Sequence, residues 1–290
     1  MPKHADSRRR SISICWRISN DSRLNVRFLE ILPLTLDDCL IPDWPAPSKV
    51  RALVTTRRGG VSRAPFDTLN LGLHAGDERD DVLANRAALG RLTDARLAWL
   101  EQVHGTHVAD AAAVLHDDLP PQADASVTDE SGVACIVMVA DCLPVLFCDA
   151  RGRAVGAAHA GWRGLSAGVL EQTAHAVARR AGEGALVHAW LGPSIGPTAF
   201  EVGRDVFDAF VDGAPATERD VTAAAFVAHR TAPQKYLADL HALARIRLRR
   251  ADVTSVTSTQ ACTVSDSERF YSYRRDRTTG RFAALVWLST

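Results

Sequence analysis

Three residues far apart in the sequence carry side chains that transition metals bind, and each one ends an apolar segment. His104 lies in LEQVHG, Cys142 in VADCLP and His159 in AAHAGWRG. Imidazole and thiolate are ligands that Zn²⁺ prefers, and three protein ligands leave a fourth position for water or substrate. The chain contains no CxxC, no HExxH, and no HxE with PCxxC. Spacing alone therefore does not decide whether these three residues bind a metal.

The same residues allow two further interpretations. Cys142 and His159 could form a thiolate–imidazole pair for nucleophilic catalysis without any metal. Backbone N–H groups in the turn before the helix expected from Leu165 could then hold an oxyanion or a phosphate. In the simplest interpretation, Cys142 is a small core residue and His159 ends a strand. The residue types alone leave all three interpretations open.

Other polar side chains occur near these segments in the sequence. His74 in NLGLHAGD and His107 in HGTHV could contact a substrate, and Asp141 could orient a ligand. A guanidinium group in a Gly-rich segment or a turn can bind an anion through two hydrogen bonds. The arginines in such segments are Arg58, Arg163 and Arg274. The loop GPSIGP (192–197) is not a dinucleotide fingerprint, because it lacks the GxGxxG pattern.

The apolar segments that hold these residues predict β-strands. The most apolar part of the chain contains three β-rich segments, at 133–140, 143–148 and 153–159. Asp149–Gly152 resembles the hairpin turn that joins the last two. Because these segments are apolar on both faces, we expect central strands that are covered on each side. Residues 51–57 and 282–288 also predict strands.

Helical periodicity appears in three segments. Residues 80–92 begin with acidic side chains, which suits a helix N-terminus. Residues 165–182 place apolar side chains at helical spacing and end at a glycine, and residues 235–250 form an amphipathic stripe. Helices and strands alternate without a regular βαβ count. This pattern favours an α+β fold or a mixed-sheet sandwich over a Rossmann unit.

Composition narrows the class of protein. The 290-residue chain has 34 basic and 34 acidic residues, so its charge gives no reason to expect nucleic acid or an anionic membrane as partner. No segment approaches the ~20 consecutive apolar residues that span a bilayer. The six cysteines show no dense disulfide framework, which favours free thiols in a reducing compartment. We therefore expect a cytoplasmic protein.

The first 41 residues differ from the rest of the chain. They are basic and rich in serine, and they show little hydrophobic periodicity. No continuous apolar stretch follows the basic region, so a secretory signal is not predicted. We expect residues 1–41 to be a disordered leader or the product of a start codon placed too far upstream. The Pro-rich segment IPDWPAPSKV then opens the folded domain, expected at 42–290.

Eight segments follow one another in a characteristic order: TTRRGGVS, NLGLHAGD, LEQVHG, ADCLPVLFCD, HAGWRGLSAGVLEQT, WLGPSIGPTAFEVG, KYLADLHALAR and FYSYRRDRTTGRFAALVWL. In this order they closely resemble the YfiH family, also called the multicopper polyphenol oxidoreductase or laccase-domain family. The resemblance covers about residues 42 to 290. It implies a single-domain, α+β, mixed-sheet α/β sandwich related to the deamidase domain of cytotoxic necrotizing factor.

The resemblance also implies a site and an activity. The family's metal residues match His104, Cys142 and His159, and the implied metal is Zn²⁺, with copper less favoured. The implied activity is a zinc-dependent purine nucleoside phosphorylase that acts on adenosine, inosine, guanosine and methylthioadenosine with phosphate, and also deaminates adenosine. On this basis the expected catalytic residues are His74, Cys142 and Arg163. The expected phosphate-binding residues are Arg58, Arg163 and Arg274.

Two other functions remain as alternatives. The implied kinship with the necrotizing-factor deamidase keeps a metal-independent Cys/His hydrolase or deamidase as one alternative. The older family name suggests a copper polyphenol oxidase, but such an enzyme needs several His-rich ligand sets with HxH pairs. The chain has ten histidines and no HxH. We expect purine nucleosides and phosphate as ligands, and a monomer or a small homo-oligomer.

Overall fold

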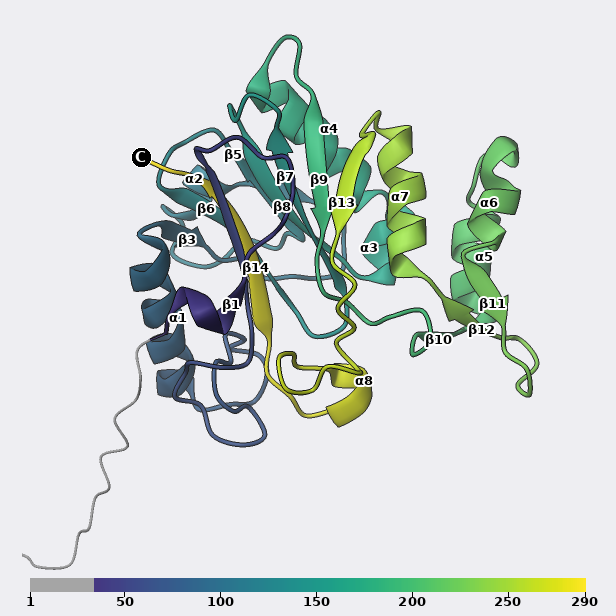
Figure 1. The fold of residues 1–290 in the computed structure, drawn as a ribbon, viewed down its shortest axis with the longest axis horizontal. Coiled ribbons are helices and arrows are strands. Elements are labelled where there is room, and N and C mark those ends of the chain that lie inside the picture. Colours follow the sequence, from purple (N-terminus) through teal and green to yellow (C-terminus); the bar gives the residue numbers. More distant parts are fainter. Residues whose placement is uncertain (1–33) are drawn as a thin grey trace, which may run out of the picture. The chain divides into compact units, whose positions relative to one another are not determined.

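Two β-sheets form the centre of the molecule in the computed structural model, which describes residues 34–290 (Figure 1). The first contains β1 (Cys39–Leu40), β2 (Val50–Thr55), β3 (Arg96–Ala98), β6 (Val133–Val139) and β14 (Phe282–Leu288), in the order β1-β2-β14-β6-β3. The second contains β4 (Val108–Asp110), β5 (Ala125–Thr128), β7 (Leu143–Asp149), β8 (Val155–Ala160), β9 (Val187–Leu191) and β13 (Ser255–Ser258). Its order is β13-β9-β7-β8-β5-β4.

Alternation of side chains along the central strands explains why these sheets pack face to face. In β6, Cys135 and Val137 join the cluster between the sheets, whereas Ile136 points to the outer face. Leu146 of β7 and Trp190 of β9 enter the same inner cluster from the second sheet. Because the side-chain period of a strand is two residues, a strand that is apolar at every position fills both faces.

Helices cover the two outer faces and complete four layers (Figure 1). Leu89 of α1 (Arg79–Thr93) packs on the first sheet with Ile136 and Leu285. The second sheet is covered by α3 (Trp162–Ala167), α4 (Val169–Ala181) and α7 (Leu240–Arg250). Short helices are η1 (Leu36–Asp38), α2 (Ala111–Val114) and α8 (Tyr273–Asp276).

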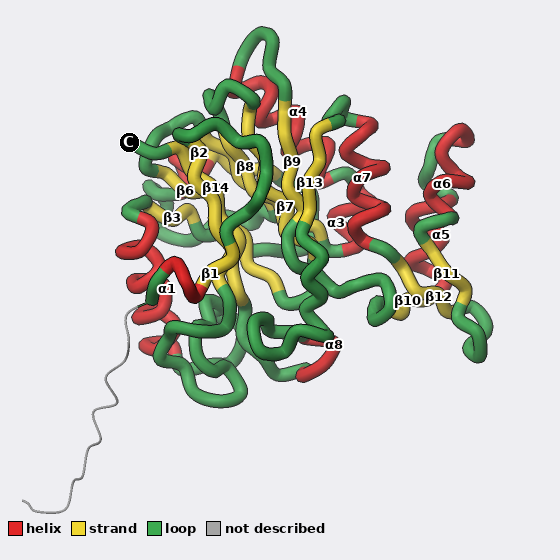
Figure 2. Tube along the Cα trace, viewed as in Figure 1, coloured by secondary structure: helices red, strands yellow, loops and turns green. Residues whose placement is uncertain are grey.

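A small third sheet lies beside α7 (Figure 2). Its strands are β10 (Glu201–Gly203), β11 (Phe226–Ala228) and β12 (Lys235–Ala238), in the order β10-β12-β11, with α5 (Arg204–Val211), η2 (Ala216–Glu218) and α6 (Arg219–Ala223) between them in the chain. Phe207 stacks on Tyr236 with ring centroids 4.5 Å apart. This aromatic contact fastens α5 to the sheet.

The expected fold class, a single-domain mixed-sheet α/β sandwich, is confirmed. The strand predicted at 282–288 is β14, and the three β-rich segments of the middle are β6, β7 and β8. The predicted hairpin turn is present, because Gly152 N donates to the Asp149 carbonyl (2.7 Å) and Cys148 pairs with Val155.

Two helix predictions need correction. The helix predicted at 165–182 is broken at Gly168, whose φ of +104° ends α3 and starts α4. The helix predicted at 235–250 begins only at Leu240, because Asp239 caps it by accepting a hydrogen bond from Ala242 N (3.0 Å). Residues 235–238 form β12 instead, since pairing with β10 and β11 satisfies their backbone.

The prediction for residues 1–41 falls largely outside the described residues. Of these residues, the structure describes 34–41, where η1 and β1 form and Cys39 and Leu40 pair with β2. Five described cysteines are free thiols, and Cys15 lies outside the described part. Among the helices of residues 34–290, none is long and apolar enough to cross a membrane.

The chain crosses from one sheet to the other several times at one end of the sandwich. Residues 99–107 lead from β3 to β4, and residues 140–142 lead from β6 to β7. Residues 259–281 lead from β13 back to β14 and carry α8. Strands β3 and β6 are parallel and adjacent, so their ends lie together, and β14 begins opposite the end of β6. Side chains on these crossings therefore meet at one place.

Candidate metal centre

His104, Cys142 and His159 meet where the chain crosses between the sheets. His104 lies on the crossing after β3, Cys142 on the crossing after β6, and His159 near the end of β8. One ligand atom of each residue lies within 4.8 Å of the others. Cys142 Sγ is 3.9 Å from His104 Nε2, and the two imidazole rings meet edge to face with centroids 4.8 Å apart. The three residues, called the trio below, form a group that could hold a metal ion.

A buried carboxylate organises two members of the trio. Asp124, directly before β5, accepts a hydrogen bond from His159 Nδ1 (2.8 Å). The same carboxylate accepts from the backbone N–H groups of Val103 (3.2 Å), His104 (2.9 Å) and Gly105 (2.6 Å). One side chain thus fixes both the ring of His159 and the loop of His104. It also leaves His159 Nε2 free to bind a ligand.

The backbone around the trio adopts conformations that need support. His104 has φ +61° and Asp141 has φ +97°, which are uncommon for residues with a Cβ. The Asp141 carboxylate accepts from Thr263 Oγ1 (2.6 Å) and Arg274 N (2.7 Å), and its carbonyl accepts from Ile195 N (2.9 Å). These contacts hold the turn that presents Cys142, a pattern found where strained backbone serves a site.

Gly161 explains part of the motif HAGWRG. A Cβ at this position would lie 2.8 Å from His104 Cδ2 and 3.0 Å from Cys142 Sγ. Only glycine leaves room for both ligands behind the strand that carries His159. The glycine therefore permits the close approach of three segments rather than a special backbone angle.

Electrostatics favours an ionised thiol at the centre. Burial alone would raise the pKa of Cys142, but the positive charge of His159 and hydrogen bonding with His104 lower it to about 6. Burial alone would lower the pKa of His159, but the Cys142 thiolate and the hydrogen bond to Asp124 raise it to about 9. Asp124 is buried, which raises its pKa, yet the hydrogen bonds from His159 and Gly105 lower it below its usual value. An ion-pair chain of carboxylate, imidazolium and thiolate results when no metal is bound.

Two cavities open on either side of Cys142. The larger, about 340 Å³, is the polar cavity, and it is lined by His74, Gln102, His104, Met138, Val139, Ala140, Cys142, His159, Tyr273 and Arg281. The smaller, about 160 Å³, is the apolar cavity, and it is lined by Ala140, Asp141, Cys142, Trp162, Ile195, Phe200, Leu240, Tyr273 and Arg274. Ala140, Cys142 and Tyr273 belong to both linings. The trio is therefore accessible from a cleft with one polar and one apolar half.

His74 lies in the polar cavity together with the trio. Partial burial and the nearby charges of Arg281 and Arg86 lower its pKa. Its imidazole is consequently neutral near pH 7 and can accept a proton. Of the residues predicted as catalytic, His74 and Cys142 share one cavity, whereas Arg163 is exposed with its guanidinium over the Trp162 ring (4.5 Å).

The three predicted phosphate-binding arginines lie apart from one another. Arg58 is exposed and contacts Glu268 (3.5 Å), and neither it nor Arg163 lines either cavity. Arg274 lines the apolar cavity, but its Nη1 and Nη2 both donate to the Glu201 carbonyl (3.0 Å each). The structure therefore brings none of the three guanidinium groups into the polar cavity.

Arg281 and Asp124 were not predicted from the sequence. Arg281 lines the polar cavity, and its Nη1 donates to the carbonyls of Thr279 and Gly280 (2.9 and 3.0 Å). Among the described residues, no acceptor bonds its Nε or Nη2, so these atoms can receive a ligand. The signal for Asp124 was a charged residue directly before the buried strand ASVT. Gln102 was not predicted either. Its amide nitrogen donates to the Met138 carbonyl and its amide oxygen accepts from the Met138 N–H (2.8 Å each).

The low pKa of Cys142 predicts its reactivity in metal-free protein. Alkylation by iodoacetamide requires the thiolate, so the rate at Cys142 should rise with pH and reach half its maximum near pH 6, not near the ~8.5 of a free thiol. Peptide mass spectrometry of chelator-treated protein measures this rate. Cys148 is the internal control and should stay unreactive across this range, because burial raises its pKa to about 12. A half-maximum above pH 8 at Cys142 would contradict the ion-pair chain.

Comparison with known proteins identifies the family. The family model described as multi-copper polyphenol oxidoreductase laccase matches residues 51–289. A protein of Pseudomonas aeruginosa named purine nucleoside phosphorylase is 55% identical over 251 residues, which is 86% of this chain and 98% of that protein. Purine nucleoside phosphorylase YfiH of Escherichia coli is 47% identical over 252 residues, with 86% and 98% covered.

Solved structures agree with these matches. A crystal structure of a Neisseria meningitidis protein superposes with a TM-score of 0.80 at 47% identity and covers 87% of this chain and 100% of that chain. YlmD from Geobacillus stearothermophilus gives a TM-score of 0.72 at 33% identity, with 84% and 93% covered. The chain accordingly belongs to the multi-copper polyphenol oxidoreductase laccase family, and it is similar to YfiH of E. coli over nearly the whole length of that protein.

Proposed function

We propose that this protein is a zinc-dependent purine nucleoside phosphorylase that also deaminates adenosine. The observation that carries the proposal is the trio, held by Asp124 and opening into a cavity that also contains a neutral imidazole and an available guanidinium. The names of the P. aeruginosa and E. coli relatives supply the reaction class. The proposed substrates are adenosine, inosine, guanosine and methylthioadenosine, and the proposed location is the cytoplasm.

The donor set fits zinc. One thiolate and two imidazoles are typical zinc ligands, and His159 donates its other ring nitrogen to a carboxylate as metal-bound histidines usually do. Exposure rises from buried His159 to exposed His104, so the fourth position would face the cavity. Bound zinc would supply Lewis acidity to a substrate oxygen or a water molecule. Within residues 34–290 this is the only group of three or more potential ligands, which argues against a multinuclear copper oxidase.

Arg281 is the proposed phosphate-binding residue. Arg281 lines the polar cavity with the trio, and its Nε and Nη2 have no acceptor among the described residues, whereas Arg58, Arg163 and Arg274 are exposed or already bonded. Guanidinium binds phosphate through parallel hydrogen bonds that gain strength away from bulk water. Burial lowers the pKa of Arg281, and the negative charges of Cys142 and Asp141 oppose this shift. We therefore place phosphate on Arg281.

The apolar cavity is the proposed site of the purine base. Its volume of about 160 Å³ suits a flat bicyclic ring, and Trp162, Phe200 and Tyr273 offer aromatic surface. Apolar walls contribute few hydrogen bonds that could tell one purine edge from another. A single site of this kind would accept adenine, hypoxanthine and guanine nucleosides. The ribose would then lie beside Cys142 and Tyr273, which border both cavities.

This placement accounts for phosphorolysis, whereas deamination requires adenine to bind with C6 towards the polar cavity. In phosphorolysis, an oxygen of hydrogen phosphate held by Arg281 forms a bond to C1′, the C1′–N9 bond breaks with its electron pair going to the purine, and the phosphate proton passes to the purine nitrogen. In deamination, water adds to C6 of adenine and ammonia leaves. Neutral His74 in the polar cavity can take the proton that water loses and pass it to the departing amino group. Both reactions need the same cleft but only the first needs the anion site.

A metal-independent Cys/His hydrolase is the second candidate. The observation in its favour is the thiolate–imidazolium pair, because a pKa of about 6 makes Cys142 nucleophilic at neutral pH. The two candidates differ in their need for metal. Activity that survives complete chelation would support the hydrolase, whereas activity restored by added zinc supports the phosphorylase.

The trio predicts the effect of removing its thiolate. Cys142→Ala should lose bound zinc and lower adenosine phosphorolysis by about 10²-fold or more, because a ligand is lost. Adenine and ribose 1-phosphate are quantified by chromatography, and zinc by elemental analysis. Cys262→Ala is the matched control and should keep both, since Cys262 lies outside both cavities. If Cys142→Ala keeps full activity and zinc, the site is assigned wrongly. If the wild type yields neither adenine nor inosine, the proposed activity is wrong.

Arg281 should separate the two reactions. Arg281→Ala is expected to raise KM for phosphate about tenfold or more, because charge-assisted hydrogen bonds are lost. Adenosine deamination, which needs no phosphate, should fall far less. Steady-state rates of adenine and inosine formation in one reaction mixture measure both effects, and Arg163→Ala is the matched control. Equal losses in both reactions would show that Arg281 has no specific role at the phosphate.

A further inference from the structure

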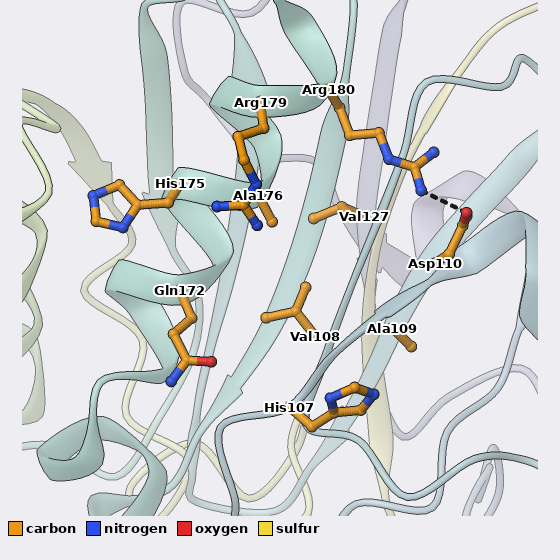
Figure 3. A pocket seen from close by; sticks show the side chains of 10 residues that line it. All are labelled: His107, Val108, Ala109, Asp110, Val127, Gln172, His175, Ala176, Arg179 and Arg180. Carbon is orange, nitrogen blue, oxygen red and sulfur yellow. Dashed lines mark hydrogen bonds and ion pairs between the residues drawn. The ribbon is translucent and has the colours of Figure 1, made fainter.

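A third cavity lies between α4 and β4, the edge strand of the second sheet (Figure 3). Its volume is about 600 Å³, within the range of small-molecule sites. It shares no lining residue with the polar or the apolar cavity. Any ligand that it holds would therefore bind apart from the trio.

Hydrogen-bond donors frame this cavity from two elements. Gln172 and Arg179 are seven residues apart on α4, so they lie on one face of the helix, two turns from each other. His107 faces them from the loop that also carries His104. Figure 3 shows Arg179 reaching from the helix over Ala176, with Gln172 and His107 below it, while the His175 ring points outward. Val108 and Val127 provide apolar surface between the donors.

The charges leave one guanidinium available. Asp110 is the only carboxylate in the lining, and Arg180 Nη2 binds it (2.5 Å). Arg180 Nη1 also binds Asp129 (2.7 Å), so Arg180 is committed to carboxylates. Arg179 is exposed and makes no hydrogen bond or ion pair to any described residue. An incoming anion would meet a carboxylate that is already neutralised and a guanidinium that is not.

We propose that this cavity is a binding site for a small organic phosphate of the size of a nucleoside monophosphate. Arg179 binds the phosphoryl group, Gln172 and His107 donate to it or to a hydroxyl, and the organic part lies on Val108 and Val127. The site does not depend on the proposed catalytic activity.

The location ties the site to the trio through one loop. The carbonyl of His107 accepts hydrogen bonds from the backbone N–H groups of Asp124 and Ala125 (3.2 Å each). The other end of the same loop binds the Asp124 carboxylate. A ligand on His107 thus contacts the segment that positions His104.

Calorimetric titration of the full-length protein with adenosine monophosphate tests the proposal. Wild type should bind it, and Arg179→Glu should weaken the affinity at least about tenfold. Arg91→Glu is the matched control, since Arg91 is also an exposed arginine in the last turn of a helix, and it should bind like wild type. Inorganic phosphate, titrated separately, should bind more weakly than the monophosphate, and adenosine binding at the catalytic cleft should not respond to Arg179→Glu.

Further variants locate the bound phosphate. Arg281→Ala should retain the binding that Arg179→Glu removes, and Arg179→Glu should retain adenosine phosphorolysis. The proposal is overturned if wild type does not bind the monophosphate at millimolar concentration. It is also overturned if Arg179→Glu binds like Arg91→Glu, if Arg179→Glu weakens adenosine binding as much as monophosphate binding, or if only Arg281→Ala loses binding.

Discussion

The hydrogen bonds to the Asp124 carboxylate are the interaction on which the rest of the site depends. A buried carboxylate is costly unless it is well bonded, and this one accepts from three backbone N–H groups and one imidazole. The three backbone donors belong to the loop of His104, and the imidazole belongs to His159. Removing the carboxylate would leave these donors unpaired and both histidines unpositioned.

The two-sheet architecture supplies the third member of the trio. The chain leaves β6 in one sheet and enters β7 in the other within three residues, and this short crossing presents Cys142. Asp141 keeps its strained backbone conformation because Thr263 and Arg274 donate hydrogen bonds to its carboxylate. These partners come from the crossing that also delivers Arg281. The geometry of the site therefore follows from where the chain crosses between the two sheets.

The features that depend on local sequence pattern could be predicted from the sequence. The central strands followed from their continuous apolar residues, and His104, Cys142 and His159 could be singled out because each ends such a segment. Asp124 could not, because a lone acidic residue before a strand usually caps a loop, and its burial arises only when the two sheets pack. Arg281 could not be chosen over Arg274 from the sequence, because both arginines lie in similar turns. Only the folded structure shows that the guanidinium of Arg274 binds the Glu201 carbonyl. The amphipathic stripe at 235–250 was misleading because strand pairing with β10 and β11 outweighed it.

The charges of Asp124, His159 and Cys142 determine the reactivity of the site. Without metal, the carboxylate, imidazolium and thiolate form a chain of alternating charge. A divalent cation would replace the proton of the imidazolium as the positive charge beside the thiolate. The same three side chains can thus serve a zinc enzyme or a thiol enzyme, and the affinity for zinc separates these possibilities.

The most direct test of the central claim is the zinc affinity of Asp124→Asn, measured by competition with a chromophoric chelator. Asparagine keeps the size of the side chain but removes its charge. We expect folded protein with zinc affinity about 10- to 100-fold below wild type, because the carboxylate orients His159 and the loop of His104. Unchanged affinity in a folded variant would contradict the claim that Asp124 organises the metal centre.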